Sequence, residues 1–222
     1  MKRVLICGLL LLMAAPIAEA RRKEKKGGEI VGNQFKDAEY GLELTLNENW
    51  KPKIGKAGEE VRLTLLQKDY AIPVDYTQVP DYTQIPLMIV YIDTTTLGPH
   101  AFIDSLASQT YKSSQKNAIF KEFEILNEPE LIPMQRTRMD LAGESALLWK
   151  VRANYKKDIQ ISTSSSTYKK VSRSYGGAVA AVKVDQNIIL FYVITEWEYY
   201  DAVLNDVLPI IESLKIQRED EG

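Results

Sequence analysis

Cysteine and histidine are almost absent from this chain, and their scarcity excludes several kinds of chemistry. The 222 residues include one cysteine, Cys7, and one histidine, His100. Cys7 lies in an N-terminal segment that we expect to be removed, which leaves no disulfide, thiol nucleophile or thiolate metal site. A single histidine argues against a histidine-based triad or a multi-histidine metal site. We interpret His100, which follows Pro99, as a surface residue at the start of a helix.

The motifs of common enzymes are also missing. Gly176 and Gly177 are not followed by a lysine or a helix, so they do not form a phosphate-binding loop. Ser145, in the sequence Gly-Glu-Ser-Ala, lacks the second glycine of a nucleophile elbow. We therefore predict that the protein is not an enzyme and uses no cofactor. A hydrolase would need a nucleophile–base pair that the sequence does not show.

The N-terminus has the three parts of a secretory signal peptide. Lys2 and Arg3 precede an apolar run over residues 4–15, and Ala18-Glu19-Ala20 matches a cleavage site. The apolar run is shorter than the ~20 residues that a membrane span requires, although a retained anchor is the alternative. We predict cleavage after Ala20 and a periplasmic or secreted protein.

Charge divides the remaining chain into a basic leader and an acidic body. Without residues 1–20, the chain has 26 basic and 29 acidic residues, a net charge of −3. Setting aside the five basic residues and Glu24 of residues 21–26 leaves 21 against 28, or −7. An acidic body argues against nucleic acid as a partner. We interpret residues 21–34 as a flexible basic linker. Residues 21–26 either stay solvated or contact an anionic membrane or an acidic protein.

Hydrophobic patterns predict an α+β fold, an antiparallel sheet of about six to seven strands with helices packed against it. Residues 188–195 form an unbroken apolar run, which is typical of a central strand buried on both faces. An amphipathic helix follows, with Pro209 inside its apolar stripe, and a second helix begins at Pro99. The other predicted strands cover residues 40–46, 61–66, 87–93, 122–126, 147–155 and 178–184.

We expect a single domain over residues 35–217, followed by a charged tail over residues 218–222. Residues 52–60 and 128–135 read as loops, the second because of its two prolines. Gly176-Gly177 reads as a further break in the chain.

A tandem hexapeptide is the most unusual feature of the sequence. Asp-Tyr-Thr-Gln-Val-Pro at residues 75–80 is repeated as Asp-Tyr-Thr-Gln-Ile-Pro at residues 81–86. Regular proline excludes a helix or a central strand, so we expect an extended loop or edge segment. Tyr76 and Tyr82 then either form an aromatic contact surface for a partner protein or pack on the domain.

Three carboxylates are close together in the sequence at the end of the central strand. Glu196, Glu198 and Asp201 could hold Ca²⁺ or Mn²⁺, or serve in acid–base chemistry. Glu196 and Glu198 share a face only if the strand continues. Alternatively, these residues are a solvated strand end and the first turn of a helix, where acidic residues favour the macrodipole.

Four segments resemble the PsbP/Mog1-like family of extracytoplasmic α+β domains. They are the opening Tyr-Gly-Leu-Glu-Leu-Thr-Leu-Asn-Glu-Asn-Trp at residues 40–50, the helix after Leu97-Gly98, residues 141–146 with the strand that follows, and the closing Ser-Leu-Lys-Ile at residues 213–216. The resemblance covers residues 38–217, and the tandem repeat looks like an insertion. It implies an accessory or binding protein with no catalytic residues to transfer.

These observations predict an exported accessory protein that docks on another protein of the cell envelope. The alternative is a periplasmic carrier of a small ligand or a metal ion, which would use a groove between the sheet and a helix.

Overall fold

The computed structural model describes residues 25–68, 85–107, 130–160 and 168–217. The predicted signal peptide, the repeat with Tyr76 and Tyr82, the predicted strand at 122–126 and the charged tail lie outside these residues, apart from the end of the repeat at Ile85-Pro86. Among the described residues, no helix is long and apolar enough to cross a membrane.

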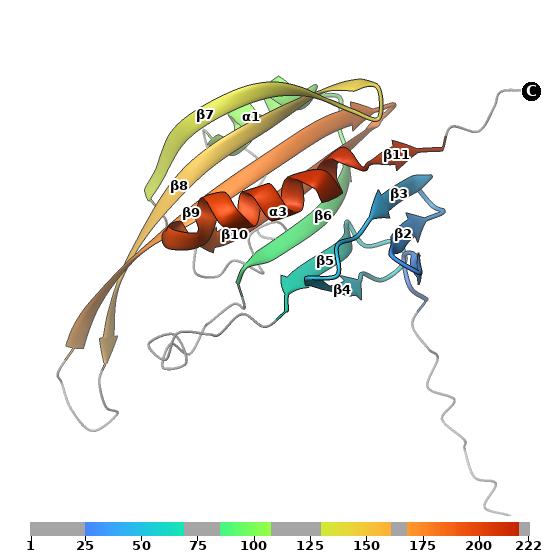
Figure 1. The fold of residues 1–222 in the computed structure, drawn as a ribbon. Helices are drawn as coiled ribbons and strands as arrows, with labels where there is room; N and C mark the ends of the chain where they lie inside the picture. The colour runs from blue at the N-terminus through green and yellow to red at the C-terminus, as the bar shows by residue number, and fades with distance from the viewer. Residues whose placement is uncertain (1–24, 69–84, 108–129, 161–167, 218–222) are drawn as a thin grey trace, which may run out of the picture.

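A seven-stranded antiparallel sheet forms the centre of the molecule (Figure 1). The strand order across the sheet is β4-β5-β6-β10-β9-β8-β7. The strands are β4(Trp50–Ile54), β5(Val61–Gln67), β6(Leu87–Thr94), β7(Glu130–Leu141), β8(Glu144–Gln160), β9(Tyr168–Val184) and β10(Asn187–Glu196). As predicted, β10 is central, and every residue from Ile188 to Glu196 is buried.

A smaller four-stranded sheet, of order β1-β2-β3-β11, stands beside the large one. It contains β1(Glu29–Val31), β2(Gln34–Asp37), β3(Leu42–Thr45) and β11(Lys215–Ile216). The predicted linker over residues 21–34 therefore includes a strand. β1 and β2 form a hairpin in which Gly32 has a φ of 62°, a value that suits glycine in a tight turn.

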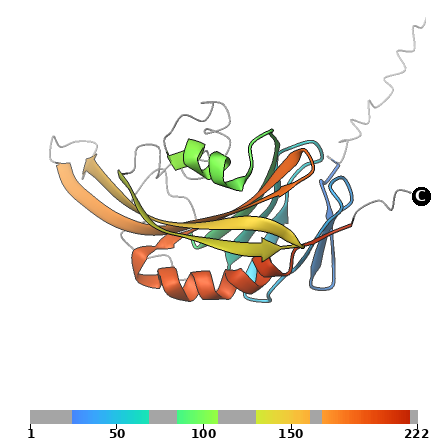
Figure 2. The same cartoon turned by 90° about the horizontal axis from the view of Figure 1, so that it is seen from above.

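The two helices cover opposite faces of the large sheet, as Figure 2 shows. Helix α1(Pro99–Ala107) covers one face through three buried residues, Phe102, Ile103 and Leu106. The short 3₁₀ turn η2(Trp197–Tyr199) and helix α3(Tyr200–Glu212) follow β10 and cover the other face. Successive side chains of β10 point to opposite faces of the sheet and enter the two hydrophobic cores. Phe191 packs in the core on the α3 side, and Leu190 packs in the core on the α1 side. The α+β fold class is confirmed.

Three strands extend through segments that were expected to be loops or breaks. β4 includes Pro52 and β7 includes Pro133; both strands lie at edges of the sheet, where a missing N–H is tolerated. The pairing of β7 with β8 shifts register between Pro133 and Gln135. β9 runs without interruption through Gly176, where an added Cβ would lie 2.1 Å from the Tyr200 ring. The glycine makes room for an aromatic side chain of α3 and does not end the strand.

Candidate functional site

The structure separates the three carboxylates at the end of β10. Glu196 is the last residue of the strand, Glu198 lies in η2, and Asp201 lies in the first turn of α3. The strand does not continue past Glu196, so Glu196 and Glu198 do not share a strand face. In the described ranges, no group of three or more His, Cys, Asp or Glu side chains could hold a metal ion. The metal alternative gains no support from this part of the chain.

Glu196 is nevertheless chemically unusual. The residue is only 5% exposed, and neither carboxylate oxygen accepts a hydrogen bond from any described residue. Burial, helped by the nearby negative charge of Glu198, raises the pKa of Glu196 to about 7. Its partner in the register with β9 is Tyr175, which is also buried. The protonated carboxyl is therefore the form that suits this position.

A cluster of polar and aromatic side chains ties β8, β9 and α3 together at the same level of the sheet. Trp197 stacks on Tyr200 with 5.5 Å between ring centroids, and the Arg152 guanidinium lies 4.7 Å from the Trp197 centroid. Arg152 Nη2 donates to Ser174 Oγ at 3.1 Å, and Ser174 Oγ donates to Asn154 Oδ1 at 2.9 Å. This cluster marks the last level at which other described strands flank β8 and β9.

Beyond this level, β8 and β9 continue as a two-stranded ribbon, which we define as residues 155–160 and 168–173. β7 follows β8 as far as the pair Glu130–Asn154, and β10 follows β9 as far as the pair Glu196–Tyr175. From Tyr155–Arg173 to Gln160–Tyr168 the ribbon strands pair with each other and with no other described strand. Figure 1 shows the ribbon projecting from the body of the molecule. Six pairs at about 3.3 Å per residue give it a length of about 20 Å.

The ribbon differs from the body in charge and in the state of its backbone edges. Residues 155–173 carry five basic side chains, Lys156, Lys157, Lys169, Lys170 and Arg173, against one acidic residue, Asp158, a net charge of +4. The whole chain carries −2, so the rest carries −6. No described strand pairs with the outer edges of the ribbon, and free strand edges are templates for pairing with another chain.

From the sequence, the Ser/Thr-rich tract within residues 161–168 is interpreted as a mobile loop or the tip of a β-hairpin, and the long ribbon strands on either side of it are not predicted. One signal was available, because two lysine pairs, Lys156-Lys157 and Lys169-Lys170, flank that tract symmetrically. Symmetrical charge around a polar tract is consistent with a solvated hairpin.

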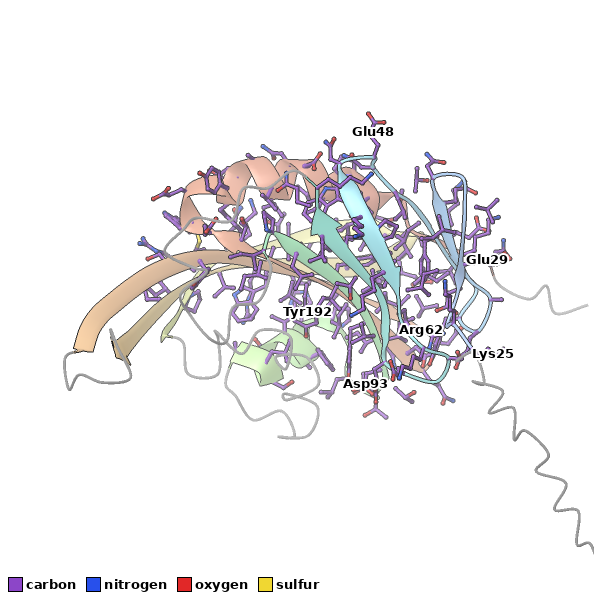
Figure 3. All side chains as sticks on the ribbon, turned by 90° about the horizontal axis from the view of Figure 1, so that it is seen from below. Lys25, Glu29, Glu48, Arg62, Asp93 and Tyr192 are labelled. Carbon is purple, nitrogen blue, oxygen red and sulfur yellow. The ribbon has the colours of Figure 1, made fainter. Side chains whose placement is uncertain are left out.

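A groove of about 710 Å³ lies at the other end of the molecule, between the edge strands β1 and β4. A bridge between Lys26 and Lys56, and a hydrogen bond from Gly27 N to Gly55 O of 2.9 Å, join the two segments that border it. The groove is lined by Lys26, Gly28, Glu29, Ile30, Lys51, Pro52, Lys53, Ile54 and Leu66. Figure 3 shows Glu29 at the end of the molecule away from the ribbon.

A buried arginine holds this end of the molecule together. Arg62 of β5 donates from Nε to Asp37 Oδ2 at 2.6 Å, from Nη2 to Glu39 Oε2 at 2.7 Å, and from Nη2 to Gly27 O at 2.7 Å. Burial alone would lower the pKa of Arg62, but hydrogen bonds and opposite charges from Asp37 and Glu39 outweigh it and raise the pKa. The small sheet is thereby fixed to the large one beside the groove.

Comparison with solved structures identifies the fold, whereas comparison of sequences assigns no family. No protein-family profile and no curated protein matches the chain. Among solved structures, the cyanobacterial PsbP (CyanoP) of Synechocystis sp. PCC 6803 matches with a TM-score of 0.50 and 10% identity. The match covers 91% of this chain and 100% of that one. The PsbP-like fold predicted from the sequence is confirmed.

A second match is more distant. LpqN of Mycobacterium tuberculosis, described as involved in cell envelope biogenesis, matches with a TM-score of 0.44 and 11% identity. It covers 80% of this chain and 83% of that one. At these values neither structure carries information on the activity of this chain.

Proposed function

We propose that this PsbP-like protein is an exported, non-catalytic accessory protein that docks on another protein of the cell envelope through its β8–β9 ribbon. The observation that carries the proposal is the ribbon itself. Six residue pairs project beyond the described parts of the flanking strands, and no described strand pairs with their outer edges. A projecting two-stranded ribbon contributes little stability by itself, because a two-stranded hairpin alone is marginally stable in water. Its position suits contact with a partner.

Charge indicates the chemistry of that partner. The ribbon carries +4 on a chain whose other residues carry −6, so it is attracted to an acidic surface. Lysines on an edge strand also discourage copies of the ribbon from pairing with each other. The same charges therefore disfavour self-association and favour an acidic partner.

Two further observations support a binding role over catalysis. The sequence has one histidine and one cysteine, and it lacks the motifs of a phosphate-binding loop and a nucleophile elbow. The PsbP-like resemblance implies an accessory role. Export rests on the predicted signal peptide at residues 1–20. Tyr76 and Tyr82 remain a second predicted contact surface.

The proposal is tested by removing the ribbon without disturbing the body. Asn154 and Ser174 are register partners, so residues 155–173 can be replaced by Asn-Gly, which closes a two-residue hairpin turn. The shortened and full-length proteins are crosslinked in the native envelope, and their partners are identified by mass spectrometry. The full-length protein should capture a partner that the shortened one loses.

The matched control for this experiment is a double variant at the opposite end of the molecule, Lys51→Gln with Lys53→Gln, which should keep the partner. Equal recovery of the same partner by the shortened protein contradicts docking through the ribbon.

A further inference from the structure

We propose that the groove between β1 and β4 binds an organic anion that has an apolar body. This site is independent of the ribbon, since the two lie at opposite ends of the molecule (Figures 1 and 3). A volume of about 710 Å³ falls in the usual range for small-ligand sites, which is about 300–1,000 Å³.

The floor of the groove is apolar. Ile30 and Ile54 are half-buried and pack against the core on the α3 side, while Leu66 packs against the core on the α1 side. Pro52, which lies on the same side of β4 as Ile54, adds a fourth apolar surface. An apolar ligand body placed here would cover side-chain surface that the fold leaves partly in water, which is favourable.

The rim of the groove is positively charged. Lys26, Lys51 and Lys53 line it and are exposed, and none of the three forms an ion pair among the described residues. Glu29 is the one acidic residue of the lining, so the lining carries a net charge of +2. Lys51 and Lys53 are two apart in β4 and therefore point to the same side of the strand. Such an arrangement favours an anionic group over a neutral or cationic one.

The backbone of β4 argues against an extended peptide as the occupant. Pro52 is opposite Leu65 of β5 and has no N–H to donate. Because pairs in an antiparallel ladder alternate, the pairs that exchange hydrogen bonds are those of Lys51 and Lys53, and the backbone of Pro52 faces the groove. An added strand would find no donor at the centre of this edge. A small anion held by side chains needs no such donor.

A pair of fluorescent probes, used on the full chain, tests whether the groove requires both an anionic group and an apolar body in its ligand. 1-Anilinonaphthalene-8-sulfonate carries a sulfonate on an aromatic body, and N-phenyl-1-naphthylamine has the same body without the charge. We expect saturable binding of the sulfonate and at least tenfold weaker binding of the neutral probe. Sodium sulfate, which lacks the apolar body, should not displace the sulfonate probe at equal concentration. Equal affinity for both probes, or displacement by sulfate, overturns the proposal.

Variants locate the probe in the groove. The double variant Lys51→Gln with Lys53→Gln should weaken the sulfonate probe at least tenfold. Lys150→Gln with Lys215→Gln, which removes the same charge from β8 and β11, should change its affinity less than twofold. All four positions are at least partly exposed, so the variants should fold. Undiminished binding to the groove variant, or an equal loss in both variants, overturns the assignment.

A third arm distinguishes a membrane anion from a soluble one. The full chain is sedimented with phosphatidylglycerol vesicles and with phosphatidylcholine vesicles. Sedimentation with the anionic vesicles alone, lost in the groove variant, assigns the anion to lipid headgroups. The absence of sedimentation, with probe binding retained, assigns it to soluble organic anions. Sedimentation that the groove variant retains in full counts against the groove as the site.

Discussion

Strands β8 and β9 pass through two different environments, and the contrast between their halves separates folding from binding. In the body, Leu147 and Trp149 of β8 and Ala180 and Ala181 of β9 are buried, and β7 and β10 pair along the outer edges. In the ribbon, the same two strands pair with each other and with no other strand that the structure describes. The buried halves therefore supply stability to the fold, while the projecting halves are the ones we propose to contact a partner.

The largest expected loss of stability comes from opening a cavity in the body. Phe191 of β10 is fully buried in the core on the α3 side. Phe191→Ala should cost about 3–5 kcal/mol, through lost burial and the cavity left behind. That loss is comparable with the whole stability of a marginal domain, so the variant should be largely unfolded. Denaturant unfolding measures it, with the exposed Glu198→Ala as a near-silent control. Wild-type unfolding of Phe191→Ala would mean that β10 is not central.

The next effect concerns Glu196, where the body ends and the ribbon begins. Its folded-state pKa of about 7 lies above the ordinary value of 4.5, so the folded state binds the proton more tightly than the unfolded state. Glu196 therefore contributes most to the stability of the folded state below pH 4.5, and this contribution is lost as the pH rises toward 7. The difference between the two pKa values corresponds to about 3 kcal/mol.

Glu196→Gln should remove this pH dependence, because glutamine is neutral throughout. Between pH 5 and pH 8, the free energy of unfolding should fall less in the variant than in the wild type. At pH 8 the variant should be the more stable of the two. An unchanged difference between the two pH values would show that Glu196 is ionised in the folded protein.

Two adjacent glycines in β9 allow a matched comparison in which the expected loss of stability is smaller. A Cβ at Gly176 would lie 2.1 Å from Tyr200 Cδ2, whereas a Cβ at Gly177 would lie 3.1 Å from Val151 Cγ1. Gly176→Ala should therefore cost about 1–3 kcal/mol, as overpacking does. Gly177→Ala should cost less, since a methyl group need move by only a few tenths of an ångström. Equal midpoints of thermal unfolding for the two variants would contradict the close approach of Tyr200.

The smallest expected effect on stability comes from the ribbon. Replacing residues 155–173 by Asn-Gly should change the free energy of unfolding by no more than about 1–2 kcal/mol. A two-stranded hairpin alone is only marginally stable in water, and loop length alters closure entropy by only about 0.6 kcal/mol per doubling. A denaturant titration of the shortened protein tests this. A loss as large as that of Phe191→Ala would make the ribbon part of the folding core.

The same contrast explains what the sequence could predict. β10, α1 and α3 were predictable because their apolar residues form a long run or a helical stripe that burial requires. β4 and β7 were missed because Pro52 and Pro133 suggest loops, and only their edge positions in the sheet tolerate them. Gly176 suggested a break, since its tertiary contact with Tyr200 is invisible in the sequence.

The candidate sites were harder to predict for a physical reason. The ribbon strands contain lysine pairs and no long apolar run, so hydrophobic periodicity gives little signal for them. The groove brings Lys26 beside Lys51 and Lys53, which are distant in the sequence and meet only when two sheet edges lie side by side. The proximity of Glu196, Glu198 and Asp201 in sequence suggested a shared site, but the end of β10 at Glu196 separates them.

The most direct test of the central claim is the affinity of a charge-reversed ribbon for the partner recovered by crosslinking. The variant combines Lys156→Glu, Lys157→Glu, Lys169→Glu and Lys170→Glu, and the equilibrium dissociation constant is measured beside that of the wild type. We expect an affinity at least tenfold weaker at physiological salt, with an unchanged unfolding midpoint, if the ribbon docks on an acidic surface as proposed and contributes little to the core. An unchanged affinity in a folded variant would contradict docking through the ribbon.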